Sequence, residues 1–207
     1  EDQKLRFLSP QASGVKYGAF GLTEPGAGSD VAAIASTARR DGNDYILNGE
    51  KTWISFATIA HHLLWFAKTD REAGSRGLTA FIIETNRNGI TRGDIRGKLG
   101  LRASSTGWVN CQDVRIPANN RIGEEGEGFK IAMSCLDNGR YTVGSGCAGV
   151  IRAALEASLK YANERKAFGR EIGTFQLVQQ KIARMTRDYE IARLMYLKVG
   201  WMKNKGI

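Results

Sequence analysis

The spacing of apolar residues divides the chain into two parts of different texture. From Gly14 to Pro117, short apolar runs alternate with turns rich in Gly, Asn and Arg, which indicates β-strands. Asn48-Gly49-Glu50 separates two such runs, and Asn-Gly accepts the positive φ angles of a tight hairpin. The strands predict a small antiparallel barrel or sandwich, and they lie at 44–47, 51–54, 62–68, 78–84 and 107–116.

After Pro117 the apolar period becomes helical. An acidic loop at 123–128 leads into a predicted helix over 129–163, with apolar residues at Leu136, Val143, Cys147, Val150, Ala154, Leu155 and Leu159. Each internal glycine costs about 1 kcal/mol relative to alanine in such a helix. The glycines predict close approach of another backbone or of a flat ligand, or a break near the first of them; they are Gly139, Gly144, Gly146 and Gly149.

The last segment has the most regular pattern. Its apolar residues alternate steps of three and four, which places them on one seam of a single long helix. Such a seam must be buried, and two helices cannot enclose it alone, so we expect further helices from another part of the protein or from another subunit. The seam consists of Phe175, Val178, Ile182, Met185, Tyr189, Ala192, Tyr196 and Val199.

Composition and the first residues limit the class of protein. The chain has 207 residues, 42% of them hydrophobic, and no apolar run approaches the roughly 20 residues that span a bilayer. Disordered tails, collagens and integral membrane proteins are excluded, and we expect no membrane partner. Residues 1–8 lack an initiator Met and have the pattern of a helix in progress, so we interpret the sequence as an internal fragment of a longer protein.

The excess of positive charge could indicate nucleic acid, a membrane surface or a phosphorylated ligand. The net charge is +9, and residues 152–205 alone hold 12 bases against 5 acids. These bases alternate with acids at helical spacing, which is typical of a solvated helix face. We therefore expect no nucleic-acid partner.

Cysteine and histidine offer little for metal or triad chemistry. The three cysteines, Cys111, Cys135 and Cys147, show no CxxC spacing, which favours free thiols in a reducing compartment. His61 and His62 are the two histidines, and nothing near them suggests an oriented nucleophile, so we expect no metal site and no catalytic triad. The GxGxxG match at 144–149 lies inside a helical pattern without a preceding strand, which argues against a Rossmann site.

Two clusters carry candidate ligand chemistry. The loop Gly21–Asp30 combines glycines with side-chain oxygens, so its backbone can approach a ligand and its hydroxyls can donate hydrogen bonds; an ordinary structured loop is the alternative. Trp53 and Ser55 lie two residues apart on one strand face. A flat aromatic cofactor would use both side chains, whereas a core Trp with a capped Ser is the alternative.

In their order along the chain these motifs resemble the acyl-CoA dehydrogenase family. Gly21–Asp30 resembles the flavin loop of that family, and 53–55 resembles its second flavin contact. Further motifs in register lie at 99–107, 126–129 and 163–169. The resemblance implies the end of an N-terminal helical domain at 1–13, a central β domain at 14–120 and the first two helices of an incomplete up-down four-helix bundle at 121–207, an α+β architecture.

The resemblance also implies chemistry. A glutamate removes the α-proton of an acyl-CoA while the β-hydrogen leaves as hydride to N5 of FAD, which gives a trans-2-enoyl-CoA. It implies FAD contacts in the β domain from Phe20, Leu22, Thr23, Gly28, Ser29, Trp53, Ile54 and Ser55. On the helices it implies contacts of Arg165, Phe168 and Gln176 with the FAD of a neighbouring subunit, although Ala167 replaces a frequent hydroxyl; a helix-end cation is the alternative for Arg165.

Substrate contacts are implied for Ser29, where pantetheine and flavin phosphate meet, and for Asp137 and Arg140, for which a structural ion pair is the alternative. Most of the family has its catalytic base beyond the position of Ile207, and a minority has it at the position of Gly139. Glycine cannot accept a proton, so we expect the base in a segment beyond Ile207 and no catalysis by this stretch alone.

Implied partners are an acyl-CoA of unspecified chain length, electron-transferring flavoprotein as acceptor, and further copies of the chain in a dimer or tetramer. The compartment would be the bacterial cytoplasm or the mitochondrial matrix, without secretion. The alternatives are flavin-binding relatives of the same fold, namely a nitroalkane oxidase, a monooxygenase or a DNA-associated protein, or a degenerate scaffold that binds no flavin.

Overall fold

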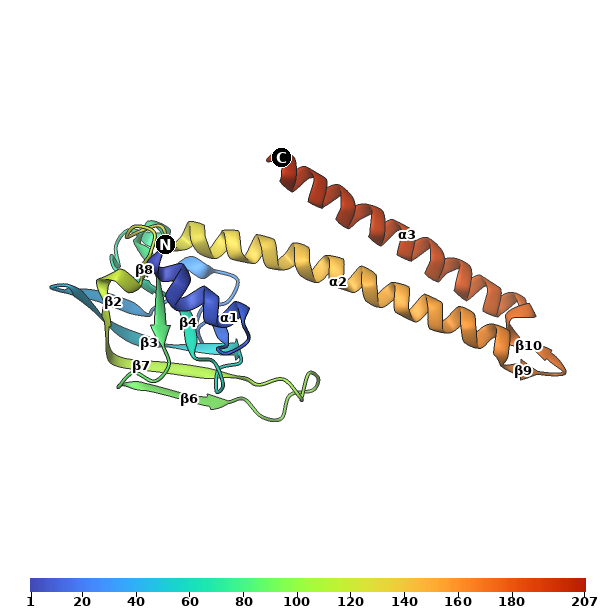
Figure 1. The fold of residues 1–207 in the computed structure, drawn as a ribbon, viewed down its shortest axis with the longest axis horizontal. Helices are drawn as coiled ribbons and strands as arrows, with labels where there is room; N and C mark the ends of the chain where they lie inside the picture. The colour runs from blue at the N-terminus through green and yellow to red at the C-terminus, as the bar shows by residue number, and fades with distance from the viewer. The chain divides into compact units, whose positions relative to one another are not determined.

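The computed structural model describes residues 1–207 and divides them into two compact units, Glu1–Ser134 and Cys135–Ile207. The first unit contains an eight-stranded sheet, and the second consists mainly of two long helices (Figure 1). The α+β class is confirmed.

The first unit opens with helix, as the sequence predicted. A π-helical turn η1 (Lys4–Leu8) runs into a short helix α1 (Ser9–Ala12). Phe7 is buried and meets His62 edge to face with ring centroids 5.0 Å apart. This contact fixes the helical segment to the sheet because it buries an aromatic ring.

The sheet is open rather than closed into a barrel. Its strands run in the order β6-β7-β3-β2-β4-β5-β8, and β1 pairs with β4 outside this path. Most pairs are antiparallel, but β1 and β2 each pair with β4 in parallel. The strands are β1 (Gly18–Gly21), β2 (Thr37–Asp41), β3 (Asp44–Ser55), β4 (His62–Lys68), β5 (Leu78–Glu84), β6 (Ile90–Asp94), β7 (Thr106–Pro117) and β8 (Arg121–Ile122). Short 3-10 turns connect them at η2 (Val31–Ala33), η3 (Gly74–Gly77) and η4 (Ala118–Asn120).

The predicted hairpin at Asn48-Gly49-Glu50 is wrong, because β3 continues through it without a turn. The register with β7 shifts between Leu47 and Gly49, which is a bulge. The Asn48 amide group bonds across the sheet to Asp113 on both of its polar atoms, each at 2.9 Å. Strands β2 and β3 turn instead at Gly42, which has φ 62°.

The core of the first unit consists of buried aliphatic and aromatic side chains, most of them contributed by the strands of the sheet. Trp65 and Phe81 face each other on β4 and β5, and Tyr45 meets Phe81 with ring centroids 4.9 Å apart. Further core residues are Leu47, Ile54, Leu63, Ile83, Val109, Val114 and Ile116.

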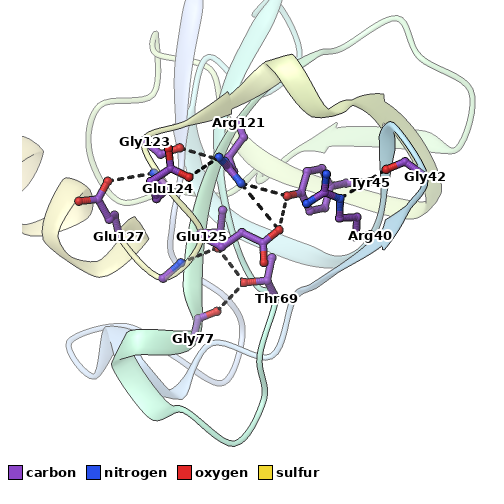
Figure 2. A network of polar contacts seen from close by, with 12 residues as sticks. Arg40, Gly42, Tyr45, Thr69, Gly77, Arg121, Gly123, Glu124, Glu125 and Glu127 are labelled. Atoms are coloured by element: carbon purple, nitrogen blue, oxygen red, sulfur yellow. Dashed lines mark hydrogen bonds and ion pairs between the residues drawn. The ribbon is translucent and has the colours of Figure 1, made fainter.

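Figure 2 shows the polar network that holds the acidic loop before α2 (Gly128–Glu164). Arg121 donates to Gly123 O at 2.9 Å and to Glu124 Oε2 at 2.5 Å. Tyr45 Oη bonds to Glu125, and burial followed by this bond raises the pKa of Tyr45. The carboxylates of Glu124 and Glu125 are therefore paired with Arg121 and Tyr45.

The second unit contains the rest of α2 and an antiparallel return helix, α3 (Gln176–Lys205). Both long helices are confirmed, and α2 shows no break at Gly139. A Cβ added at any of the four internal glycines would meet no atom within 4 Å, so no backbone described here approaches them. The small pair β9 (Lys166–Ala167) and β10 (Arg170–Glu171) and the turn η5 (Ile172–Thr174) connect the helices.

The predicted seam of α3 lies on its less exposed face. From Phe175 to Tyr196 the seam residues are half-buried, whereas the residues between them are mostly exposed, and no α3 residue is fully buried. On α2, Val143 and Val150 are 66% and 70% exposed. Two helices therefore leave much of their apolar surface exposed, as the pattern predicted.

Candidate functional site

The loop after β1 is folded back on itself and held against β3. Glu24 and Ala27 exchange backbone hydrogen bonds of 2.9 and 3.1 Å across a two-residue turn. The Thr52 amide donates to the Thr23 carbonyl at 2.8 Å. The structure therefore places the two sequence clusters side by side.

Strand β3 bulges at Trp53. The register with β7 shifts between Lys51 and Ile54, and Trp53 has φ 59°. Trp53 is 61% exposed and Ser55 is exposed, whereas Ile54 between them is buried. A bulky residue in this conformation costs about 1–3 kcal/mol and persists only where the surroundings hold it. An exposed indole beside a hydroxyl can pack on a flat aromatic ligand and hydrogen-bond to its edge.

Side chains of β6 hold the turn that follows this strand. Asp94 Oδ1 accepts hydrogen bonds from Thr58 Oγ1 and Ser105 Oγ, both at 3.0 Å. Arg92 donates to Ala60 O at 2.7 Å. These hydrogen bonds of Asp94 and Arg92 hold the turn after β3 against β6.

The other predicted flavin residues of this unit lie on the same loop and strand. Phe20 is half-buried and packs against Phe66 with ring centroids 5.3 Å apart, and Thr23 is half-buried. Gly28 and Ser29 are exposed at the loop tip. Leu22 and Ile54 are only 4% and 2% exposed, so neither presents its side chain to a ligand.

A buried ion pair that the sequence pattern did not indicate lies beneath these residues. Lys51 is 0% exposed, and its Nζ lies 2.7 Å from Glu24 Oε1. Burial lowers the pKa of Lys51 to about 8, against the attraction of Glu24. Burial would raise the pKa of Glu24, but the charge and hydrogen bond of Lys51 outweigh it and hold that pKa below 4.5. A charged residue at an inward strand position was the available signal.

The predicted contacts with a neighbouring subunit lie on the connection between the helices. Phe168 is 96% exposed with φ 51°, and its ring stands perpendicular to that of Phe175 at 6.2 Å. Arg165 and Gln176 are exposed at the two ends of the connection. Ile172 N donates to Arg165 O at 2.8 Å, which closes the connection into one compact turn.

The predicted substrate residues Asp137 and Arg140 line one groove of 560 Å³ between α2 and α3. Lys203 Nζ lies 2.5 Å from Asp137 Oδ2, and this bond, followed by the charge of Lys203, lowers the pKa of Asp137. Met195 and Tyr196 contribute the apolar side of the groove. The structure therefore places Asp137 in an ion pair and leaves Arg140 beside it.

An open sheet that presents an exposed indole and hydroxyls, followed by two long helices, defines an α+β protein with a surface suited to a flat aromatic ligand. Residues 19–114 match the family model "Acyl-CoA dehydrogenase, middle domain", and residues 126–207 match "Acyl-CoA dehydrogenase, C-terminal domain". The chain therefore belongs to the acyl-CoA dehydrogenase family.

Named relatives support this assignment along the whole chain. A glutaryl-CoA dehydrogenase of Desulfococcus multivorans is 43% identical over 207 residues, which are 100% of this chain and 53% of that protein. The CarC subunit of the caffeyl-CoA reductase–Etf complex of Acetobacterium woodii is 42% identical over 99% of this chain and 54% of that protein. The structure of butyryl-CoA dehydrogenase from Megasphaera elsdenii is similar with a TM-score of 0.92 and 41% identity, and the match covers 99% of this chain and 54% of that one.

The chain therefore spans about half the length of these relatives. No helix in the structure combines the length and the apolar character that crossing a bilayer requires.

Proposed function

We propose that this chain is the central part of an FAD-dependent acyl-CoA dehydrogenase. The whole protein would oxidise the Cα–Cβ bond of an acyl-CoA thioester to a trans-2-enoyl-CoA. FAD supplies the hydride acceptor, at N5 of its isoalloxazine ring. The observation that supports this most is the exposed, backbone-strained Trp53 with Ser55, beside the Thr23 loop.

The residues of the β unit fit the proposed cofactor. Trp53 and Phe20 offer aromatic surface for the ring system, and the hydroxyls of Thr23 and Ser55 can donate to the acceptor atoms of its edge. A Cβ added at Gly28 would meet no atom within 4 Å, so the loop tip presents open backbone. An exposed, glycine-rich backbone of this kind permits close approach of a ligand.

The residues proposed to contact the acyl-CoA are Ser29 at the loop tip of the first unit and, separately, Asp137 and Arg140 in the groove of the second unit. Arg140 can hold an anionic group of CoA, since a guanidinium binds phosphate by charge-assisted hydrogen bonds. Asp137 is ionised at neutral pH, and the hydrogen bond and charge of Lys203 lower its pKa further. A carboxylate can accept hydrogen bonds from amides or hydroxyls of the substrate.

In a dimer or tetramer, Arg165, Phe168 and Gln176 of one copy of the chain would contact the FAD that is bound to a neighbouring copy. The exposed ring of Phe168, held at a positive φ, supports a contact of this kind. Electron-transferring flavoprotein is the proposed electron acceptor, supported by the Etf complex named for one relative. Residues 1–13 would end an N-terminal helical domain, and the compartment would be bacterial cytoplasm or mitochondrial matrix.

The catalytic base is proposed to lie in the part of the family's length that this chain does not span. Gly139 has no side chain that could take the α-proton. The residues described here would therefore bind and orient, and a glutamate elsewhere in the protein would accept the proton.

Anaerobic titration of the whole flavin-loaded protein with acyl-CoAs tests the proposal. Loss of the visible flavin absorbance on addition of an acyl-CoA is the expected result. A flavin that is not bleached by any acyl-CoA, together with salt-sensitive DNA binding, would instead indicate a DNA-associated member of the fold.

A further inference from the structure

Lys51 connects the two segments that present the proposed flavin residues. It lies at the centre of β3, and its ammonium donates to Glu24 Oε1 at 2.7 Å and to Leu22 O at 3.2 Å. The same ammonium lies 5.2 Å from the ring centroid of Trp65. A buried ammonium is costly unless it is paired and hydrogen-bonded. Here both hydrogen-bond acceptors of the ammonium, Glu24 and Leu22, belong to the loop.

Glu24 extends this connection to the far end of the loop. Its Oε2 accepts from Ala35 N at 2.5 Å, and its Oε1 accepts from Ser36 N at 3.1 Å. Ala35 and Ser36 precede β2. One buried pair therefore ties together both ends of the loop and the strand beneath it.

The bond to Leu22 also orients the next peptide group. The chain has no cis peptide bonds, so the Leu22 carbonyl and the Thr23 N–H point in opposite directions. Because Leu22 O points inward to Lys51, the Thr23 N–H points away from it. The following carbonyl, Thr23 O, accepts from Thr52 N, next to the bulge at Trp53.

We propose that the buried Lys51–Glu24 pair is the positioning device of the flavin site. It fixes the Leu22–Thr23 peptide and the bulge at Trp53 in one arrangement. The N–H and hydroxyl of Thr23 and the indole of Trp53 can then contact the same ligand. Lys51 acts through these groups and does not touch the ligand. The inference rests on the proposed function, because it concerns the placement of FAD.

Lys51→Met, Glu24→Gln and the double variant test this role in the whole protein. The measurements are FAD affinity by titration of the apoprotein, the visible spectrum of the bound flavin, its midpoint potential and the temperature of unfolding. Arg115→Met is the control, because Arg115 pairs with Asp41 and Asp44 at the opposite end of β3.

Each single variant should bind FAD about tenfold more weakly or worse, the factor expected when a buried hydrogen-bonding partner is lost. The flavin spectrum and potential should shift as well. The double variant removes the uncompensated buried charge, so its unfolding temperature should recover towards the wild-type value while its FAD affinity, spectrum and potential stay altered. Arg115→Met should leave all flavin measurements unchanged.

Wild-type FAD affinity, spectrum and potential in a folded double variant would overturn the inference and leave the proposed function intact. A wild-type apoprotein that takes up no FAD would refute the proposed function, and the positioning role with it. The altered flavin of a stable double variant separates positioning from a purely structural role, which would change the unfolding temperature alone.

Discussion

The Lys203 ammonium lies 2.5 Å from the Asp137 carboxylate and joins the end of α3 to α2. The two side chains are 29% and 70% exposed, and the pair lines the same groove as Arg140. The ion pair sets the charge of the proposed CoA site, because it neutralises a carboxylate beside the arginine.

Lys203→Met should raise the pKa of Asp137 towards its ordinary value, since the hydrogen bond and charge that lower it are lost. It should also weaken binding of free CoA by up to about fivefold, because an unpaired carboxylate then faces an anionic ligand at an exposed position. NMR titration of the Asp137 carboxyl carbon and calorimetric CoA titration measure the two effects.

Asp137→Asn in the Lys203→Met background is the matched control. It removes the uncompensated charge, so CoA affinity should return towards the wild-type value if repulsion caused the loss. If the CoA affinity is the same in the wild type, in Lys203→Met and in the double variant, the substrate binds elsewhere and Asp137 is not part of its site.

Ser55→Ala should lower the flavin content of the purified protein or slow flavin reduction by acyl-CoA. The hydroxyl is exposed at the end of β3, and the variant removes one donor to the flavin edge without disturbing the buried Ile54. Ser55→Thr retains the hydroxyl and serves as the control. Unchanged flavin content and reduction rate in Ser55→Ala would refute the proposed contact of Ser55 with the flavin edge.

Gly49→Ala should lower the free energy of unfolding by about 3 kcal/mol, from overpacking and backbone strain together. Gly49 has φ 140°, and an added Cβ would lie 2.7 Å from Ser36 Cα. Gly42→Ala is the control, because Gly42 has φ 62° but nothing within 4 Å of its Cβ position. Gly42→Ala should cost about 1 kcal/mol, from backbone strain alone. Urea unfolding compares the two, and equal losses would contradict the steric argument.

The sequence predicted those elements whose pattern is local. The two long helices followed from their apolar period, because a helix places neighbours of its seam three and four residues apart. The hairpin at Gly49 failed because the glycine is required by Ser36, which is distant along the chain, and not by a turn. The actual turn contains Asp41-Gly42, a dipeptide that was equally visible in the sequence.

The candidate site was predictable only in part, and for a related reason. Thr23, Trp53 and Ser55 belong to two compact motifs, so their proximity followed from the resemblance. The bulge that exposes Trp53 depends on the register between β3 and β7, which no local pattern encodes. The Lys51–Glu24 pair likewise joins residues that only the fold places together.

Glu24 should make the protein sensitive to acid. Its pKa in the folded protein lies below 4.5, so its stabilisation is fully present above that value and is lost as the pH falls through the folded pKa. Glu24→Gln should reduce the free energy of unfolding at about pH 7 by about 3 kcal/mol, because it leaves the buried Lys51 unpaired. It should also flatten the fall in stability as the pH decreases below about 4.5, since one carboxylate no longer takes up a proton.

Urea unfolding at pH values above and below 4.5, followed by tryptophan fluorescence, to which the buried Trp65 contributes, measures both effects. Glu84→Gln is the comparison. Burial raises the pKa of Glu84, but Arg87 and Arg6 outweigh this effect and lower that pKa, and Glu84 lies on a strand away from Lys51. It should flatten the same slope while leaving Lys51 paired. If Glu24→Gln lost stability equally at every pH, the carboxylate would not be ionised in the fold, and the charged state assigned to the pair would be wrong.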